Sequence, residues 1–267
     1  SLISWVVGAV MMIIIAMTFA ELVCLTPVPG GNARFIQFSH GTLTSFIFSW
    51  MMWLGYAAVA PVETMGVLQY LSSVYPSLVA QKLGVTVLTG EGYIAAAIVL
   101  FLMCILNFAS IKWLSRWNAV IVWFKVFVPV IVAICLIYAA FNIHHFHSVG
   151  GFMPNGLHGV ASAISYGGIV FSFAGYAPAI VLAGEAKNPQ KTIPLVLIGA
   201  LVTCLCVYFI LEVSFIGSVQ PDMLTHGWSK LHFSGDASPF VGLAHLYNLD
   251  ILKKMIFIMA VLAPLGT

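Results

Sequence analysis

The chain has 267 residues, of which 61% are hydrophobic and only 7% are charged, and its formal net charge is +2. A soluble domain carries about 25% charged residues, so this composition excludes an ordinary water-soluble domain. Apolar runs of about 20 residues, the length that crosses a bilayer, recur along the sequence. Runs such as "VVGAVMMIIIAMTFA" are apolar on every face, whereas the strands of a transmembrane β-barrel alternate. The composition therefore predicts an all-α membrane protein with several spans.

In chain order, seven apolar segments are candidate membrane spans. We expect them near residues 3–25, 42–73, 93–111, 118–141, 159–184, 194–219 and 250–267, within one transmembrane domain covering 1–267. The second segment is too long for a perpendicular crossing, so it must tilt or extend beyond the lipid. The polar segment 220–249 is expected to form an external cap of short helices.

Basic residues predict the orientation of the chain. The loops after the first, third and fifth spans hold Arg34, Lys112, Arg116, Lys187 and Lys191, whereas the opposite loops hold Lys82 and Lys230, with Lys253 and Lys254 at the start of the last span. Cytoplasmic loops carry an excess of Lys and Arg, so residue 1 is expected outside and the loop 26–41 in the cytoplasm.

Few residues in this sequence suit catalysis or metal binding. Three histidines in "NIHHFHSVGGFMPNG", residues 142–156, could bind a metal or could simply be solvated at the membrane surface. The spans offer no histidine pair at mid-membrane depth, no nucleophile–base arrangement and no phosphate loop. We therefore expect no enzymatic activity, no cofactor, no metal and no nucleic-acid partner.

The segment "FSFAGYAPA", residues 171–179, contains two residues that weaken a helix, Gly175 and Pro178. Gly175 lies ten residues before Glu185, or about 15 Å of helix, which places it near the middle of a hydrocarbon core about 30 Å thick. Unwound backbone at that depth survives only where it faces protein or a water-filled cavity. Secondary transporters use such broken helices as binding sites. Alternatively, the segment's glycines, with Gly167 and Gly168, permit close helix packing.

Four stretches of the sequence together resemble one known family. They are "FSFAGYAPAIVLAGEAKNPQKTIP" at 171–194, "FAELVCLTPVPGGNARF" at 19–35, "WMMWLGYAAVAPVETMGVLQYLSSVYP" at 50–76 and "APLGT" at 263–267. They resemble the amino acid–polyamine–organocation permeases, and in particular the branch similar to proton-coupled aspartate transporters. The resemblance implies part of a fold with two inverted five-span repeats and discontinuous helices.

By this resemblance, the seven spans correspond to the family's second to eighth, and the first span and the last part lie outside the chain. The family's first span supplies the other half of the substrate cradle, so the fragment alone is not expected to transport. The substrate contacts implied on this chain are Phe171, Ser172, Phe173, Ala174, Gly175 and Tyr176. For each phenylalanine, ordinary packing is the alternative to a role as an aromatic gate.

Two acidic residues lie inside predicted spans, Glu63 and Glu212. A carboxylate at that depth costs several kcal/mol unless it is paired or protonated. Either residue could take up the coupling proton, or could be a protonated donor that ties helices together. The family often carries other polar residues just after the break, where this chain has Ala177 and Pro178. Because of this departure, neither the family's coupling mechanism nor a preference for acidic substrates transfers directly to this chain.

A further group of residues lies at the predicted cytoplasmic ends of the spans. It consists of Glu21, Gly30, Gly31, Glu185, Lys187, Asn188 and Pro189. Opposite charges there could form an inside gate that opens and closes, or a static salt bridge at the helix ends.

The sequence thus predicts an amino acid permease that carries out secondary active transport by alternating access, coupled to protons. An exchanger of amino acids or amines with the same fold, and a sensor that kept the fold without transporting, are the alternatives. The expected partners are an amino acid, protons and membrane lipid. The expected location is the plasma (inner) membrane of a prokaryote.

Overall fold

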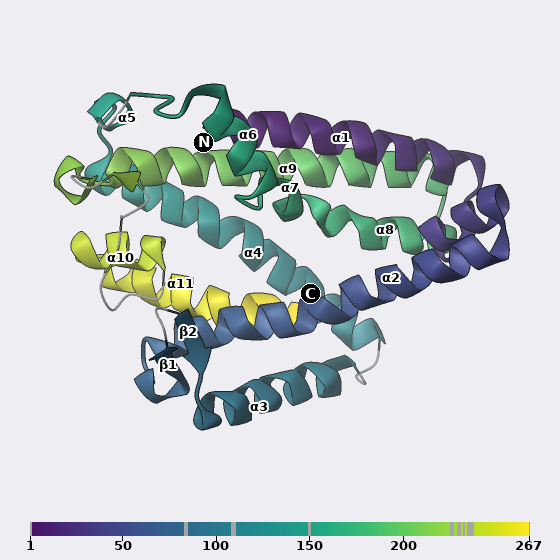
Figure 1. The fold of residues 1–267 in the computed structure, drawn as a ribbon, viewed down its shortest axis with the longest axis horizontal. Helices are drawn as coiled ribbons and strands as arrows, with labels where there is room; N and C mark the ends of the chain where they lie inside the picture. The colour runs from purple at the N-terminus through teal and green to yellow at the C-terminus, as the bar shows by residue number, and fades with distance from the viewer. Residues whose placement is uncertain are drawn as a thin grey trace. The chain divides into compact units, whose positions relative to one another are not determined.

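The computed structural model describes residues 2–82, 85–107, 111–148, 151–224, 227–228, 231, 233 and 238–266, and these are mostly helical (Figure 1). The α-helices are α1 (Leu2–Leu25), α2 (Gly31–Ser72), α3 (Gly90–Asn107), α4 (Ile111–Ala140), α5 (His145–Ser148), α6 (Gly156–Ser165), α7 (Ile169–Ser172), α8 (Ala177–Val181), α9 (Pro189–Ser218), α10 (Pro239–Leu246) and α11 (Asp250–Leu262). Short 3-10 helices are η1 (Pro76–Leu78), η2 (Ala174–Tyr176), η3 (Ala183–Glu185), η4 (Pro221–Leu224) and η6 (Ala263–Gly266).

Four of these helices are long and apolar enough to cross a membrane, and the bent pair formed by α6 and the segment 169–181 would make a fifth. The four are α1, α2, residues 118–140 of α4, and α9. The predicted spans 93–111 and 250–267 fall on the shorter helices α3 and α11. That each of the seven segments crosses the membrane stays a prediction.

Helix α2 begins at Gly31, well before the predicted start of the second span at residue 42. At Gly41 the backbone leaves the helical region, with φ 81° and ψ 177°, so residues 31–40 form a separate helical piece before the kink. Glycine adopts such a positive φ at little steric cost. The sequence "GNARFIQFSH" is too polar to read as a span, which is why the prediction missed this piece.

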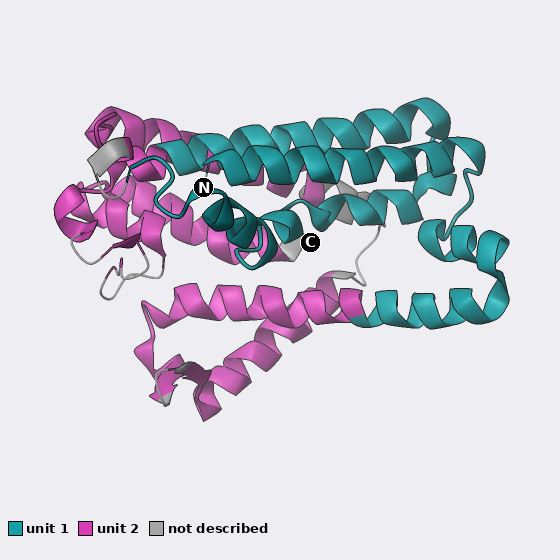
Figure 2. Cartoon of the chain, turned by 45° about the horizontal axis from the view of Figure 1, so that its top comes forward, with its two compact units in different colours: residues 1–54, 150–213 teal, residues 55–149, 214–267 magenta. Residues whose placement is uncertain are grey.

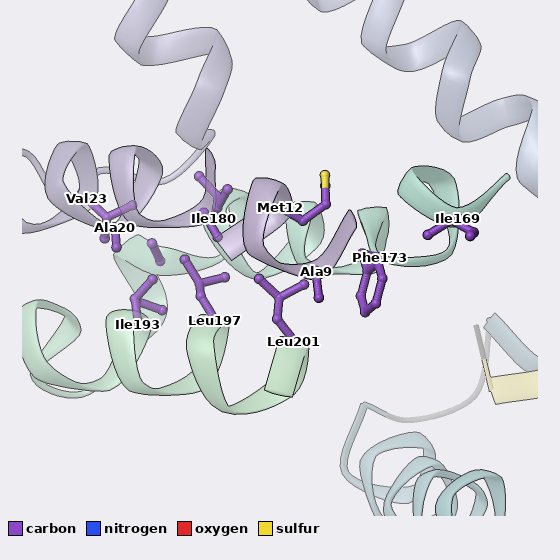
Figure 3. Close-up of a cluster of buried hydrophobic side chains, with 12 residues drawn as sticks. Ala9, Met12, Ala20, Val23, Ile169, Phe173, Ile180, Ile193, Leu197 and Leu201 are labelled. Carbon is purple, nitrogen blue, oxygen red and sulfur yellow. The ribbon is translucent and has the colours of Figure 1, made fainter. Parts of the chain in front are cut away.

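The chain divides into two compact units, residues 1–54 with 150–213 and residues 55–149 with 214–267 (Figure 2). In unit 1, α1 runs beside α9, and α6, α7 and α8 pack along α1 (Figure 1). Their side chains meet in a buried cluster (Figure 3) that consists of Ala9, Met12, Ala16, Ala20, Val23, Ile169, Phe173, Ile180, Ala183, Ile193, Leu197 and Leu201. The α1 members are three or four residues apart, so they share one helix face. The alanines among them allow neighbouring backbones to approach closely.

In unit 2, α11 packs against α4 and α10. The end of α9 is held by the turn after α4, because the carbonyl of Gly217 accepts a hydrogen bond from the amide of Asn142 at 2.9 Å and shares another with His145 Nδ1 at 2.8 Å. Ser218 Oγ donates to the carbonyl of Leu136 at 3.2 Å, and its own carbonyl accepts from the hydroxyl of Tyr247 at 2.7 Å.

A small antiparallel hairpin, which the sequence analysis did not predict, also belongs to unit 2. Strands β1 (Val79–Lys82) and β2 (Val85–Leu88) pair with Val79 opposite Leu88. The β-branched residues of "VTVL" favour a strand, but the segment is too short to stand out against its apolar surroundings. Within the predicted cap 220–249, the structure has η4 and α10, and residues 225–226, 229–230, 232 and 234–237 lie outside the described residues.

Candidate functional site

The predicted break in the fifth candidate span, residues 159–184, is present in the structure. Helix α6 ends at Ser165, the chain bends by 47°, and a short helix α7, the 3-10 turn η2 and the short helix α8 follow. The bend lies at 166–168, seven residues or more before Gly175. Gly168 takes the left-handed conformation there, with φ +76°, which glycine adopts more readily than any residue with a β-carbon.

Pro178 does not cause the bend, contrary to its assignment as a helix-weakening residue. It lies in the first turn of α8, where a missing N–H costs nothing because no helical acceptor would receive it. Gly175 lies in η2 rather than at the bend. The segment is therefore irregular over two places, the Gly167–Gly168 turn and the 3-10 turn at 174–176.

Three of the six predicted substrate contacts are exposed residues of this segment. Phe171 is 75% exposed, and Ser172 and Gly175 are exposed as well. A β-carbon added at Gly175 would have nothing within 4 Å. Phe171 and Ser172, at the end of α7, and Gly175 in η2 are therefore exposed residues of the irregular segment.

The other three predicted contacts are buried or half-buried within unit 1. Phe173 is 2% exposed and belongs to the buried cluster (Figure 3). Ala174 and Tyr176 are half-buried, and the ring of Tyr176 lies 6.4 Å from that of Phe19, centroid to centroid. In this structure Phe173 is a packing residue, as the alternative interpretation had it.

A residue that sequence reasoning missed, Tyr208 of α9, holds the broken segment. Its hydroxyl donates a hydrogen bond to the carbonyl oxygen of Ser172 at 3.2 Å. Ser172 Oγ in turn donates to the carbonyl of Gly168 at 3.0 Å. A single tyrosine within the apolar stretch "CLCVYFILE" gives no sign, in sequence, of which element it will meet.

In unit 2, the acid Glu63 of α2, which was predicted to lie inside a span, acts electrostatically on Lys125 of α4. Both side chains are half-buried. Lys125 was not selected from the sequence, although a lone basic residue inside an apolar span is itself a signal of function. The other predicted acid, Glu212, is half-buried in α9 and is not without a partner.

The predicted cytoplasmic turn packs tightly on the end of the broken segment. The amide of Gly30 donates to the carbonyl of Val181 at 3.1 Å. A β-carbon at Gly31 would lie 2.7 Å from the carbonyl oxygen of Ile180, and one at Gly184 would lie 2.5 Å from the nitrogen of Pro29. Only glycines permit this approach of two main chains.

The start of α9 is fixed at the same end of unit 1. Cys24 Sγ donates to the carbonyl of Gln190 at 3.2 Å, and Gln190 Nε2 donates to the carbonyl of Cys24 at 3.2 Å. Asn188 has φ 53°, and its carbonyl accepts from the amides of Lys191 and Thr192 as α9 begins at Pro189.

The predicted gate charges, Glu21, Glu185 and Lys187, are all exposed. Among the described residues none of the three forms an ion pair, so no static salt bridge joins them within that part of the chain. The gate itself stays a prediction.

Comparison with known proteins shows which family the chain belongs to. The whole chain, residues 1–267, matches the family described as amino acid permease. It is 36% identical to the glutamate/serine transporter AimA of Bacillus subtilis, over all of this chain and 50% of that protein. The chain belongs to the amino acid permease family. The predicted membership of the amino acid–polyamine–organocation superfamily is therefore confirmed.

Other relatives of this permease chain carry related descriptions. It is 33% identical to the aspartate-proton symporter of Bacillus subtilis, over 98% of this chain and 50% of that protein. It is 25% identical to the aromatic amino acid transport protein AroP of Escherichia coli K12, over 84% of this chain. The permease chain spans about half the length of these relatives. Its family and its apolar helices make it a multi-pass membrane protein, and these relatives are transporters, not enzymes.

Proposed function

We propose that the full-length protein is a secondary carrier that moves an amino acid across the plasma membrane of a prokaryote by alternating access. The observation that carries the proposal is the broken segment, in which Phe171, Ser172 and Gly175 are exposed and a β-carbon at Gly175 would meet nothing within 4 Å. An α-amino acid carries an ammonium and a carboxylate. Accessible carbonyls suit the ammonium, and helix N-terminal amides suit the carboxylate.

Protons are the proposed coupling ion. Glu63 and Lys125 are opposite charges that attract each other within unit 2. Protonation of the carboxylate would remove that attraction, so an inward proton gradient can change the charge that Lys125 meets. The relative described as an aspartate-proton symporter supports this choice of ion.

The deciding experiment is uptake of labelled amino acids by the full-length protein in proteoliposomes, with an imposed inward proton gradient and without one. Glutamate, serine and aspartate come first, because relatives are described as transporters of these. Uptake that requires the gradient supports the proposal. Uptake only into vesicles preloaded with amino acid, whatever the gradient, would make the protein an exchanger. Folded protein that takes up none of the standard amino acids would be a sensor, and the proposal would fall.

A further inference from the structure

The carbonyl of Ser172 lies where the regular helix stops. Ser172 is the last residue of α7, and the chain continues as the 3-10 turn 174–176, in which each carbonyl bonds three residues ahead instead of four. At that change of pitch a donor from outside the segment reaches the carbonyl, namely the hydroxyl of Tyr208 at 3.2 Å. Because lipid offers no donor, this bond gives Ser172 a partner that its own helix does not provide.

The ring of Tyr208 is held on two sides. Its centroid lies 4.9 Å from that of Trp5 and 5.5 Å from that of Phe173, and the rings of Trp5 and Phe173 are 6.0 Å apart. The three rings come from α1, from the residue after α7 and from α9, all within unit 1. Phe173 follows Ser172 directly. Tyr208 of α9 therefore contacts two adjacent residues of the segment, Ser172 through a hydrogen bond and Phe173 through a ring contact.

We propose that Tyr208 is a positioning residue for substrate binding in this permease, an inference that rests on the function proposed above. Its hydroxyl occupies the Ser172 carbonyl and so keeps residues 172–176 in the broken form that exposes Gly175. Without the hydroxyl, the carbonyl must find another donor, and the segment shifts toward arrangements that bind substrate poorly. The apparent affinity then falls by the fraction of molecules that leave the binding-competent form.

The test is Tyr208→Phe in the full-length protein, which keeps the ring contacts but removes the hydroxyl, and with it the bond to the Ser172 carbonyl and the side-chain interaction with Cys204. Loss of the bond to Ser172 predicts an increase in the KM of uptake of about 3- to 10-fold, with Vmax per folded molecule nearly unchanged. Tyr138→Phe is the matched control, since Tyr138 in α4 is 94% exposed. Its KM should equal that of the unaltered protein.

Replacement of Tyr208 by p-aminophenylalanine provides a rescue arm. This side chain has the shape of tyrosine and still donates a hydrogen bond, so KM should return toward the original value. Replacement by p-methoxyphenylalanine cannot donate and should leave KM raised. Amide hydrogen exchange over residues 169–177 should be faster in Tyr208→Phe than in Tyr138→Phe.

An unchanged KM in Tyr208→Phe would overturn the proposal, as would a lower Vmax with constant KM, because both describe a purely structural contact. Failure of the amino variant to restore KM would overturn it too. These results leave the carrier function standing. If the unaltered protein takes up no amino acid, the proposed function itself fails and the role in substrate binding fails with it. Hydrogen exchange then decides separately whether Tyr208 holds the segment.

Discussion

Gly31 lies against Ile180 so closely that a β-carbon on the glycine would be 2.7 Å from the isoleucine carbonyl oxygen. The contact joins the start of α2 to α8 within unit 1 through main-chain atoms alone. The neighbouring bond from Gly30 N to the Val181 carbonyl fixes the same approach. No side chain can rotate away to make room here.

Gly31→Ala should therefore destabilise the protein. The residue has φ +41°, and a non-glycine residue in that region costs about 1–2 kcal/mol before any clash is counted. We expect a loss of about 2 kcal/mol or more once the main chain shifts, measured as a lower thermal unfolding temperature in detergent. Gly199→Ala in α9 is the control, since nothing lies within 4 Å of its added β-carbon. Equal stability of the two variants would contradict the close approach.

The two phenylalanines on either side of Ser172 should respond in opposite ways to truncation. Phe173→Ala removes a side chain that is 2% exposed, so we expect a loss of about 3–5 kcal/mol of stability. Phe171→Ala removes one that is 75% exposed, and the stability should change by about 0.5 kcal/mol or less. Thermal unfolding of both variants measures this difference.

The affinity for substrate should also depend on Phe171. If the exposed ring of Phe171 meets the substrate ammonium, its loss removes about 0.5–1 kcal/mol, or a 2- to 5-fold weaker affinity by the same conversion. Equilibrium binding of labelled amino acid to purified Phe171→Ala measures it. Normal affinity would remove Phe171 from the site.

The broken segment shows how far the sequence predicts this fold. Glycines and a proline in an apolar run were enough to predict that the helix is interrupted. The prediction centred the interruption on Gly175, whereas the bend lies at 166–168, because Gly167, Gly168 and Gly175 can all adopt irregular backbone. The position of the bend depends on packing, since Phe173 must turn inward to meet Trp5 and Tyr208. Such contacts between distant elements have no local signature.

The same limit explains the two partners that sequence reasoning missed. Tyr208 lies 36 residues after Ser172, and Lys125 lies on a different helix from Glu63. Glu63 stood out because an acid in an apolar run is costly. The importance of Lys125 became visible only when the structure showed that the charge of Glu63 acts on it.

Glu63→Gln should uncouple uptake from the proton gradient. The amide keeps the shape of the side chain but cannot release a proton or attract Lys125 as a carboxylate does. We expect gradient-driven uptake to fall to the level without a gradient, while exchange of internal for external amino acid persists. Glu91→Gln, in the exposed first turn of α3, is the control.

Glu212→Gln is the parallel arm. If this variant, rather than Glu63→Gln, loses the response to the gradient, the coupling carboxylate is Glu212.

A double-mutant cycle with Lys125→Met supplies a second measure for Glu63. Removing both members of an interacting pair should cost less stability than the sum of the single losses. Additive losses would mean that the two residues act independently.

Gly175→Leu is the sharpest perturbation of the proposed substrate site. A β-carbon added at Gly175 would have nothing within 4 Å, so we expect insertion and thermal stability to be maintained. A leucine there would cover the main chain at 172–175 and compete with any ligand for that surface. We expect amino acid affinity to fall by about tenfold or more, a change of at least about 1.4 kcal/mol. Gly199→Leu, equally open and on α9, adds the same side chain elsewhere in unit 1 and should bind normally. Equal affinity of the two variants would show that the substrate does not use the broken segment, whatever else carries it across the membrane.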